Sequence, residues 1–153
     1  MLTLDETDRR IVAALDRDPR ATVLWIAREL GLARGTVHAR LERLASADVL
    51  APHSVRVRPA ALGHPMRAFV TAEVDQAEFD GMIADMRQIP QVVEVAGTSG
   101  DSDLMVEIVA RDADHVYDVT QQITRCRGVR RTSTRIVLRD LVARRLDQLV
   151  LPG

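Results

Sequence analysis

The stretch IARELGLARGTVHARL, residues 26–41, decides the fold of the N-terminal part of this chain. Its apolar residues follow helical spacing on both sides of the short segment 31–33. Gly31 is well suited to the position just after a helix, where the backbone turns left-handed. Two helices joined by a tight turn that contains glycine are typical of a helix-turn-helix motif, which the sequence therefore predicts here.

A further helix is predicted upstream of this stretch. Asp5 can cap its N-terminus, with Asp8 three residues later in a variant of the capping box. Pro19 ends the helix, because proline cannot continue it. Thr22 then caps the second helix, residues 23–30, and the third runs from about residue 34 to residue 47. Residues 1–50 are thus expected to form a three-helix, winged-helix-like DNA-binding domain.

The third helix has two distinct faces. Val37, Leu41 and Leu44 form an apolar stripe, and the opposite face and its margin are small or cationic. Such a face suits the major groove of DNA. An ordinary solvated helix face is the alternative interpretation. The predicted DNA-binding residues are Arg34, Gly35, Thr36, Ala39, Arg40 and Arg43.

Charge is distributed unevenly along the chain. Residues 20–58 contain seven arginines and three acidic residues, whereas residues 59–153 contain eleven arginines and fourteen acidic residues. The net charge of −1 hides this asymmetry. A basic N-terminal part favours DNA as its partner. Trp25 points toward a flank of the second helix, where it either packs against another element or marks an interface.

Residues 51–64 read as a connection between domains. Pro52, Pro59 and Gly63 interrupt regular structure, and the alternating residues 54–58 lie between them. Alternation bounded by breakers predicts a short linker strand.

The pattern of residues 65–140 predicts the order βαββαβ of a ferredoxin-like domain, which makes the chain α+β overall. Strands are expected at 68–74, 92–96, 104–110 and 129–139. Helices are expected over 79–89 and after a cap at Asp112 or Asp114. Residues 141–153 form a tail in which 144–146 are expected to be a solvated helix end.

Helices can cover only one face of such a sheet. The other face is expected to be apolar and to pair with a second copy of the chain. The predicted dimer-interface residues are Phe69, Met105, Val109 and Val137.

At this point the chain resembles the leucine-responsive regulatory protein (Lrp)/AsnC family of transcriptional regulators. The resemblance runs from about residue 4 to residue 138, in motifs whose order and spacing make it specific. The matching motifs are Leu4-Asp5-x-x-Asp8-x-x-Ile11, Ile26-Ala27-x-x-Leu30-Gly31-Leu32, Val37-x-x-Arg40-Leu41-x-Arg43-Leu44, Gly97-Thr98-x-Gly100-Asp101-x-Asp103-Leu104 and Gly128-Val129-x-x-Thr132-x-Thr134.

The resemblance implies a ligand-responsive C-terminal domain, with an amino acid bound between subunits near a Gly-Asp turn. It also implies homodimers and often octamers. Backbone N–H groups of a glycine-rich turn can hold a carboxylate, and an aspartate can hold an ammonium group. Local turn chemistry is the alternative role of the two aspartates. The predicted effector-binding residues are Gly97, Thr98, Ser99, Gly100, Asp101 and Asp103.

Other chemistry finds little support in the sequence. His38, His53, His64 and His115 lack metal-ligand spacing, and Cys126 is the single cysteine. No phosphate-binding glycine motif is present. We therefore expect no metal, no cofactor and no enzymatic activity. No apolar run is long enough for a bilayer and residues 1–6 do not resemble a secretory signal, so a cytoplasmic protein without membrane contact is expected.

Two functions remain open. The first is a sequence-specific transcriptional regulator that binds double-stranded DNA and responds to a small effector, an amino acid. The second is an amino-acid-binding oligomeric module whose helix-turn-helix contacts proteins instead of DNA. The basic N-terminal part favours the first.

Overall fold

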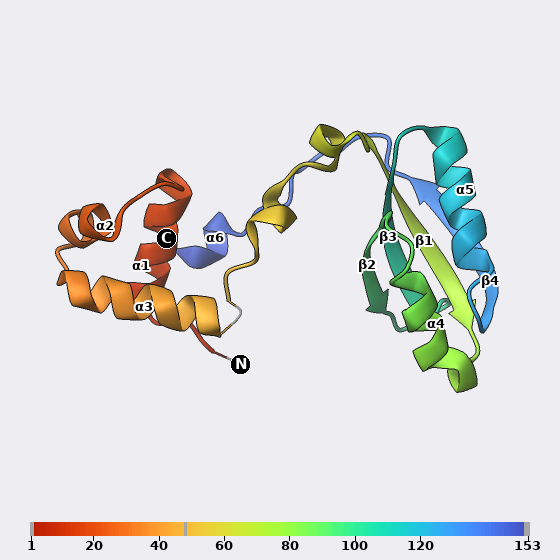
Figure 1. The fold of residues 1–153 in the computed structure, drawn as a ribbon, viewed down its shortest axis with the longest axis horizontal. Helices are drawn as coiled ribbons and strands as arrows, with labels where there is room; N and C mark the ends of the chain where they lie inside the picture. The colour runs from red at the N-terminus through yellow and green to blue at the C-terminus, as the bar shows by residue number, and fades with distance from the viewer. Residues whose placement is uncertain (1, 48, 152–153) are drawn as a thin grey trace. The chain divides into compact units, whose positions relative to one another are not determined.

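The computed structural model describes residues 2–47 and 49–151. It is α+β, as predicted, and divides into two compact units (Figure 1). One unit contains the residues up to Arg56 together with those from Val142 onward, and the other contains Val57–Leu141.

Helices make up the first unit, and their ends follow the local sequence signals. The Asp5 carboxylate accepts the Asp8 N–H at 2.9 Å and the Asp8 carboxylate accepts the Asp5 N–H at 3.1 Å, which confirms the predicted capping box. Gly31 ends the second helix with a φ of 66°, in the left-handed region that favours glycine. The helices are α1 (Glu6–Arg17), α2 (Val23–Leu30) and α3 (Arg34–Ser46).

The core of this unit is aliphatic. Val37 of α3 packs with α1 and α2 side chains, Leu44 is also buried, and Leu41 is half-buried. The inward face predicted for α3 is therefore confirmed. The clustered core residues are Ile11, Ala14, Ile26, Ala27 and Val37.

The C-terminal segment belongs to the same unit. Residues 144–146 are exposed, as expected, but the helix begins after them, as α6 (Asp147–Val150). Arg9 of α1 donates from Nη1 to the Leu149 carbonyl at 2.7 Å. The last residues of the chain thus contact the helix-turn-helix unit, which the sequence pattern did not indicate.

The predicted linker strand is wrong. Its place is taken by two 3₁₀ helices, His53–Arg56 and Pro59–Leu62. Local turn hydrogen bonds replace strand pairing: the Val55 N–H donates to the Pro52 carbonyl at 3.1 Å. Alternation predicts a strand only where a neighbouring strand accepts its hydrogen bonds, and the described chain offers none here. The winged part of the expected domain is therefore absent from the described residues of the first unit.

The second unit is a four-stranded antiparallel sheet in the order β2-β3-β1-β4 with two helices, which confirms the ferredoxin-like fold (Figure 1). The end of β4 is shorter than predicted, but the Val137 N–H still donates to the Arg67 carbonyl at 2.8 Å. The elements are β1 (Met66–Val74), α4 (Phe79–Met86), β2 (Val92–Gly97), β3 (Leu104–Ala110), α5 (Ala113–Thr124) and β4 (Val129–Ile136).

One face of the sheet carries the core. Alternate residues of β1 and β3 are buried against α4 and α5, which supply residues such as Met82 and Val119. Because strand residues alternate between faces, the other residues of β1 and β3 point to the opposite, open face. The core residues of the two strands are Ala68, Val70, Ala72, Val74, Leu104, Val106, Ile108 and Ala110.

Gly128 joins α5 to β4 in a conformation that other residues rarely adopt. Its φ is +71°, and a Cβ atom there would lie 2.7 Å from the Glu78 Cβ. We expect Gly128→Ala to lower the free energy of unfolding of the second unit by about 2–4 kcal/mol through left-handed strain and overpacking. Chemical denaturation followed by circular dichroism measures this. Gly35→Ala is the control, because a Cβ there meets no atom within 4 Å; equal loss in both variants would contradict the argument.

Candidate DNA-binding and effector sites

The N-terminal half of α3 presents an exposed surface. Arg34, Gly35, Thr36 and Ala39 are all exposed, as predicted for residues that face DNA. His38 is exposed on the same turns, and its Nε2 lies 3.4 Å from the Glu42 carboxylate. His38 was not among the predicted DNA-binding residues, although its position next to Ala39 in the sequence places it at this surface.

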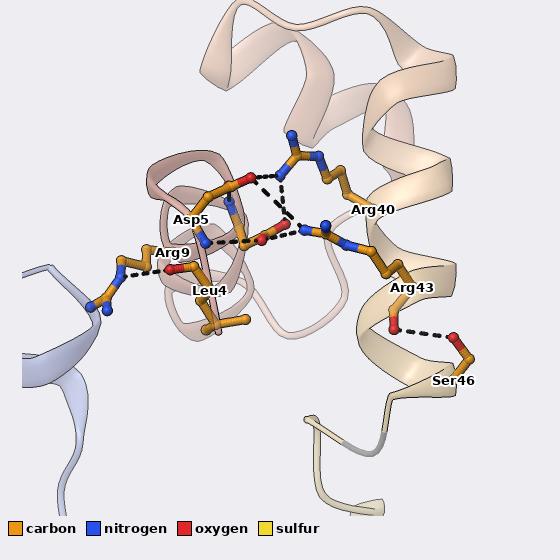
Figure 2. Close-up of polar contacts among 7 residues, drawn as sticks. Leu4, Asp5, Arg9, Arg40, Arg43 and Ser46 are labelled. Atoms are coloured by element: carbon orange, nitrogen blue, oxygen red, sulfur yellow. Dashed lines mark hydrogen bonds and ion pairs between the residues drawn. The ribbon is translucent and has the colours of Figure 1, made fainter. Parts of the chain in front are cut away.

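Arg43 is exposed, as predicted, and Arg40 is half-buried, but the guanidiniums of both residues also pair with carboxylates near the start of α1. Figure 2 shows both side chains reaching from α3 toward Asp5 at the start of α1. The helical pattern of α3 alone could not reveal this, because the partners lie more than thirty residues away.

Asp8 is the centre of the contact. Its side chain is 0% exposed, whereas the side chains of Arg40 and Arg43 are 27% and 43% exposed. Arg40 Nη1 donates to Asp8 Oδ1 at 2.9 Å and also to Asp5 Oδ2, while Arg43 Nη2 donates to Asp8 Oδ2. We call these four residues the α1–α3 clamp. With the Asp5 N–H, the two guanidiniums satisfy a carboxylate that burial would otherwise destabilise.

The clamp alters the acidity of its carboxyl groups. Hydrogen bonds from the Arg40 guanidinium and from the Asp8 N–H lower the pKa of Asp5 from 3.8 to about 2. Burial of Asp8 acts in the opposite direction, but hydrogen bonds from Arg40, the Asp5 N–H and Arg43 outweigh it, so the pKa of Asp8 is also lowered. Both groups therefore favour the charged form in the folded protein.

This shift predicts acid sensitivity of the first unit. The folded pKa of Asp5 lies below its unfolded value, so its contribution to stability is present above about pH 3.8 and is lost as the pH falls toward 2. We expect wild type to be more stable than Asp5→Asn at neutral pH and the difference to shrink over this range. Fluorescence of Trp25, the only tryptophan, monitors the unit during denaturation. A difference that stays constant with pH would contradict the linkage.

The turn 97–103 is held by hydrogen bonds within the chain. Asp103 Oδ2 accepts the Val74 N–H at 2.8 Å, and the Asp103 N–H donates to the Ala72 carbonyl at 3.0 Å. The Thr98 hydroxyl donates to the Ser102 carbonyl at 2.7 Å. Asp103 thus bonds the backbone of β1, about thirty residues earlier in the chain, so its carboxylate has a structural partner that neither the effector role nor local turn chemistry predicted. Gly97, Thr98, Ser99, Gly100 and Asp101 are exposed.

A cavity of about 200 Å³ lies beside this turn at one end of the open sheet face. We call it the turn pocket. Its lining includes two acidic residues, Glu73 and Asp101, and two basic residues, Arg131 and Arg135. The Arg135 Nη1 donates to the Thr71 hydroxyl at 3.3 Å, and Arg131 Nη1 lies 3.7 Å from Glu73 Oε1. Sequence reasoning missed these strand residues; the alternation of β1 and β4 was the signal that could have found them. The remaining lining residues are Thr71, Ser102, Thr132 and Ser133.

The open sheet face is less apolar than predicted. The strand register places Phe69 and Met105 on it, with Met105 39% exposed. Val137 follows the end of β4, where its N–H donates to the Arg67 carbonyl. Val109 is only 7% exposed within the single chain, so its expected role as bare surface is wrong. Arg67 lies across this region, with its guanidinium carbon 5.7 Å from the centre of the Phe69 ring. A partner at this face would meet charged as well as apolar groups.

Other candidate groups are less informative. Trp25 remains 38% exposed, so no described element of the chain covers it fully. Cys126 is buried, and burial together with the charge of Asp85 raises the pKa of its thiol, which disfavours a reactive thiolate. Among the helices that the structure describes, none has the length and apolar character needed to cross a membrane.

A helix-turn-helix unit joined to a ferredoxin-like domain defines a class of DNA-binding regulators that carry their own sensor domain. Two family profiles match this chain: the AsnC-type helix-turn-helix domain over residues 4–45 and the Lrp/AsnC ligand binding domain over residues 67–147. The HTH-type transcriptional regulator FL11 of Pyrococcus horikoshii is 32% identical over 136 residues, which cover 89% of this chain and 90% of that protein.

Solved structures agree in fold. Escherichia coli AsnC superposes with a TM-score of 0.83 at 24% identity, over 95% of this chain and 99% of that chain. The Neisseria meningitidis regulator NMB0573, in complex with L-Met, superposes with a TM-score of 0.79 at 20% identity, over 96% of this chain and 99% of that chain. The protein belongs to the Lrp/AsnC family of helix-turn-helix transcriptional regulators, which confirms the resemblance seen in the sequence.

Proposed function

We propose that this regulator binds its operators through the N-terminal half of α3 and that an amino acid, bound in the turn pocket, controls this binding. The observation that carries the proposal is the pairing of guanidiniums and carboxylates around a cavity of about 200 Å³. A ligand with a carboxylate and an ammonium on one carbon would find a partner of opposite charge for each.

The DNA-binding surface is argued from exposure. Arg34, Thr36 and Ala39 lie on the first turns of α3, where a recognition helix meets base edges. The backbone approach at Gly35 is unobstructed, because no atom lies within 4 Å of a Cβ placed there. His38 joins this surface. Arg40 and Arg43 contribute less to DNA binding than these residues, because their charges are already paired with the carboxylate of Asp8.

The effector is argued from size and charge. The turn pocket is smaller than the roughly 300–1,000 Å³ of pockets for drug-sized ligands, so it suits a small molecule. Arg135 makes no ion pair among the described residues and can bind a carboxylate, while Asp101 can bind an ammonium group. The complex of the neisserial relative with L-Met lends support, since that protein has the same fold.

The functional unit is a dimer through the open sheet face. Phe69, Met105 and Val137 supply apolar contact, and the turn pocket at one end of this face would lie at the subunit boundary. Two recognition helices could then meet DNA half-sites about 34 Å apart or a multiple of that distance. Octamers would follow from further association of dimers. Light scattering at micromolar concentration tests the assembly, and a monomer there would refute it.

Binding experiments test the function as a whole. Gel-shift titrations of the purified protein use the duplex upstream of its own gene and a shuffled duplex of equal composition, at several salt concentrations. Calorimetry against the twenty amino acids is run in parallel. We expect preference for the upstream duplex, affinity that falls with salt, and binding of at least one amino acid. Equal and weak binding to both duplexes would favour the module whose helix-turn-helix contacts proteins, and no heat with any amino acid would refute the effector.

A transcriptional regulator acts where the chromosome is, so we also propose a cytoplasmic location. The proposal includes no metal, cofactor or catalytic step. Relatives of the protein are named as a transcriptional regulator and a regulatory protein.

A further inference from the structure

We propose that Asp5 and Asp8 are positioning residues for the recognition helix, and that Arg40 and Arg43 serve to orient α3 instead of reading bases. This inference rests on the proposed DNA-binding role of α3. It assigns a function to the α1–α3 clamp, a set of contacts that joins the first helix of the domain to its third.

The spacing of the clamp suits two facing helices. Asp5 is the N-cap of α1 and Asp8 is the third residue of that helix, and the capping box holds them beside each other. Arg40 and Arg43 are three residues apart within α3, a spacing that places them on the same side of the helix, one turn apart. Each pair thus forms a short row, and the two rows meet in the ion pairs seen in Figure 2.

Helix α3 is weakly fixed at its own N-terminus. Ala33 provides no side-chain cap, and Gly35 follows in the first turn. The capping side chains present on α1 and α2 have no equivalent here. Its apolar anchors, Val37 and Leu44, are buried, but apolar contacts are not directional and tolerate some rotation of the helix.

The clamp supplies the missing directionality. Charge-assisted hydrogen bonds require the guanidinium and carboxylate groups to approach in defined directions. Asp8 is fully buried, so any rotation of α3 that broke its bonds to Arg40 and Arg43 would leave a buried charge unpaired. The rotation of α3 about its axis is therefore restricted, and with it the direction in which Arg34, Thr36 and Ala39 face DNA.

The test compares conservative variants of the two acids. Asp8→Asn removes the charge and keeps the shape, and Asp5→Asn does the same while keeping an equally good N-cap. Glu6→Gln is the matched control, because it removes one negative charge from the same turn and makes no ion pair in the described structure. This control accounts for the general attraction of DNA to a more positive protein.

Affinity is measured for the upstream duplex and for the shuffled duplex, each over a range of salt. We expect Asp8→Asn to weaken binding to the upstream duplex about tenfold relative to Glu6→Gln, as for a lost base contact, with binding to the shuffled duplex unchanged. The slope of log affinity against log salt concentration, here called the salt slope, reports the number of phosphate contacts. It should be the same as in wild type for Asp8→Asn and for Arg43→Ala. Arg34→Ala removes a cation from the proposed DNA-binding surface and should weaken binding to the upstream duplex without faster amide exchange in α3.

Amide hydrogen exchange gives a readout that does not depend on DNA. We expect faster exchange in residues 34–46 of both Asn variants, with exchange in the sheet unchanged. If Asp8→Asn fails to fold, Asp5→Asn decides the matter, because Asp5 is at the surface.

Two results would overturn the inference. One is an Asn variant with the exchange of wild type in α3 and the wild-type preference for the upstream duplex. The other is an Arg43→Ala protein whose amide exchange in α3 equals that of wild type and whose salt slope is smaller by about one. Arg43 would then contact a DNA phosphate. If wild type itself does not distinguish the two duplexes, the DNA-binding proposal is refuted. The exchange data then still test whether the clamp fixes α3.

Discussion

Replacing both clamp arginines, Arg40→Ala with Arg43→Ala, is expected to lower the melting temperature of the helix-turn-helix unit by on the order of 10 °C. The reason is that Asp8 is 0% exposed and loses both cations that pair with its carboxylate. A buried charge without a partner is among the most destabilising changes in a protein. The unit is followed by Trp25 fluorescence, and the sheet by amide exchange in β1 and β3, which should not change.

The acid response of this double variant should differ from that of wild type. Without its guanidinium partners, burial is the dominant influence on Asp8 and raises its pKa above the unfolded value. The variant therefore gains stability relative to wild type as the pH falls and Asp8 becomes protonated. Arg34→Ala is the control on the same helix, and its effect on stability should be within about 0.5 kcal/mol. If the melting temperature of the double variant equals that of the Arg34→Ala control, the clamp is unimportant for stability.

Replacing Arg135 by alanine is expected to weaken the amino-acid effector about 10- to 100-fold, the equivalent of about 1.5–3 kcal/mol for a hydrogen-bonded charge. Arg135 lines the turn pocket, and the Thr71 hydroxyl holds its Nη1 at 3.3 Å. The amino acid that binds wild type most tightly is titrated into both proteins by calorimetry. DNA binding without effector should be unchanged, because the pocket lies in the second unit.

Arg130→Ala is the matched control for this prediction. Arg130 lies five residues before Arg135 on β4, is not among the residues that line the turn pocket, and pairs with Asp75 at 2.7 Å. We expect its affinity for the effector to equal that of wild type. Asp103→Ala should lower both the affinity for the effector and the stability of the second unit, because loss of the bond to the Val74 N–H weakens the turn itself. Equal affinity of Arg135→Ala and wild type would remove Arg135 from the site.

Most helix and strand positions could be predicted because their causes are local. Asp5, Thr22 and Asp112 each cap the helix that follows them, and alternation along β1 matches its buried face. The linker shows the limit of the same reasoning. Residues 54–58 alternate like a strand, but strand formation depends on a neighbour that the alternation does not contain.

The candidate sites show the same division. The exposed positions of α3 follow from helical periodicity, and the turn 97–103 follows from its glycines and aspartates. The ion-pair partner of Arg43 does not follow from periodicity, because Asp8 lies 35 residues earlier in the chain. The turn pocket likewise needs three separate segments: β1 contributes Glu73, the turn contributes Asp101, and β4 contributes Arg131 and Arg135.

The sequence by itself determined the two-part α+β organisation, the helix caps and the family, since these depend on residues within one or two turns of each other or on motif spacing. Only the tertiary structure decided how distant groups are paired. It brought Arg40 and Arg43 to the buried Asp8, engaged Asp103 with the backbone, and set α6 against α1. The physical reason is that a charged side chain takes the partner that folding brings near it, and one helix or strand does not specify that partner.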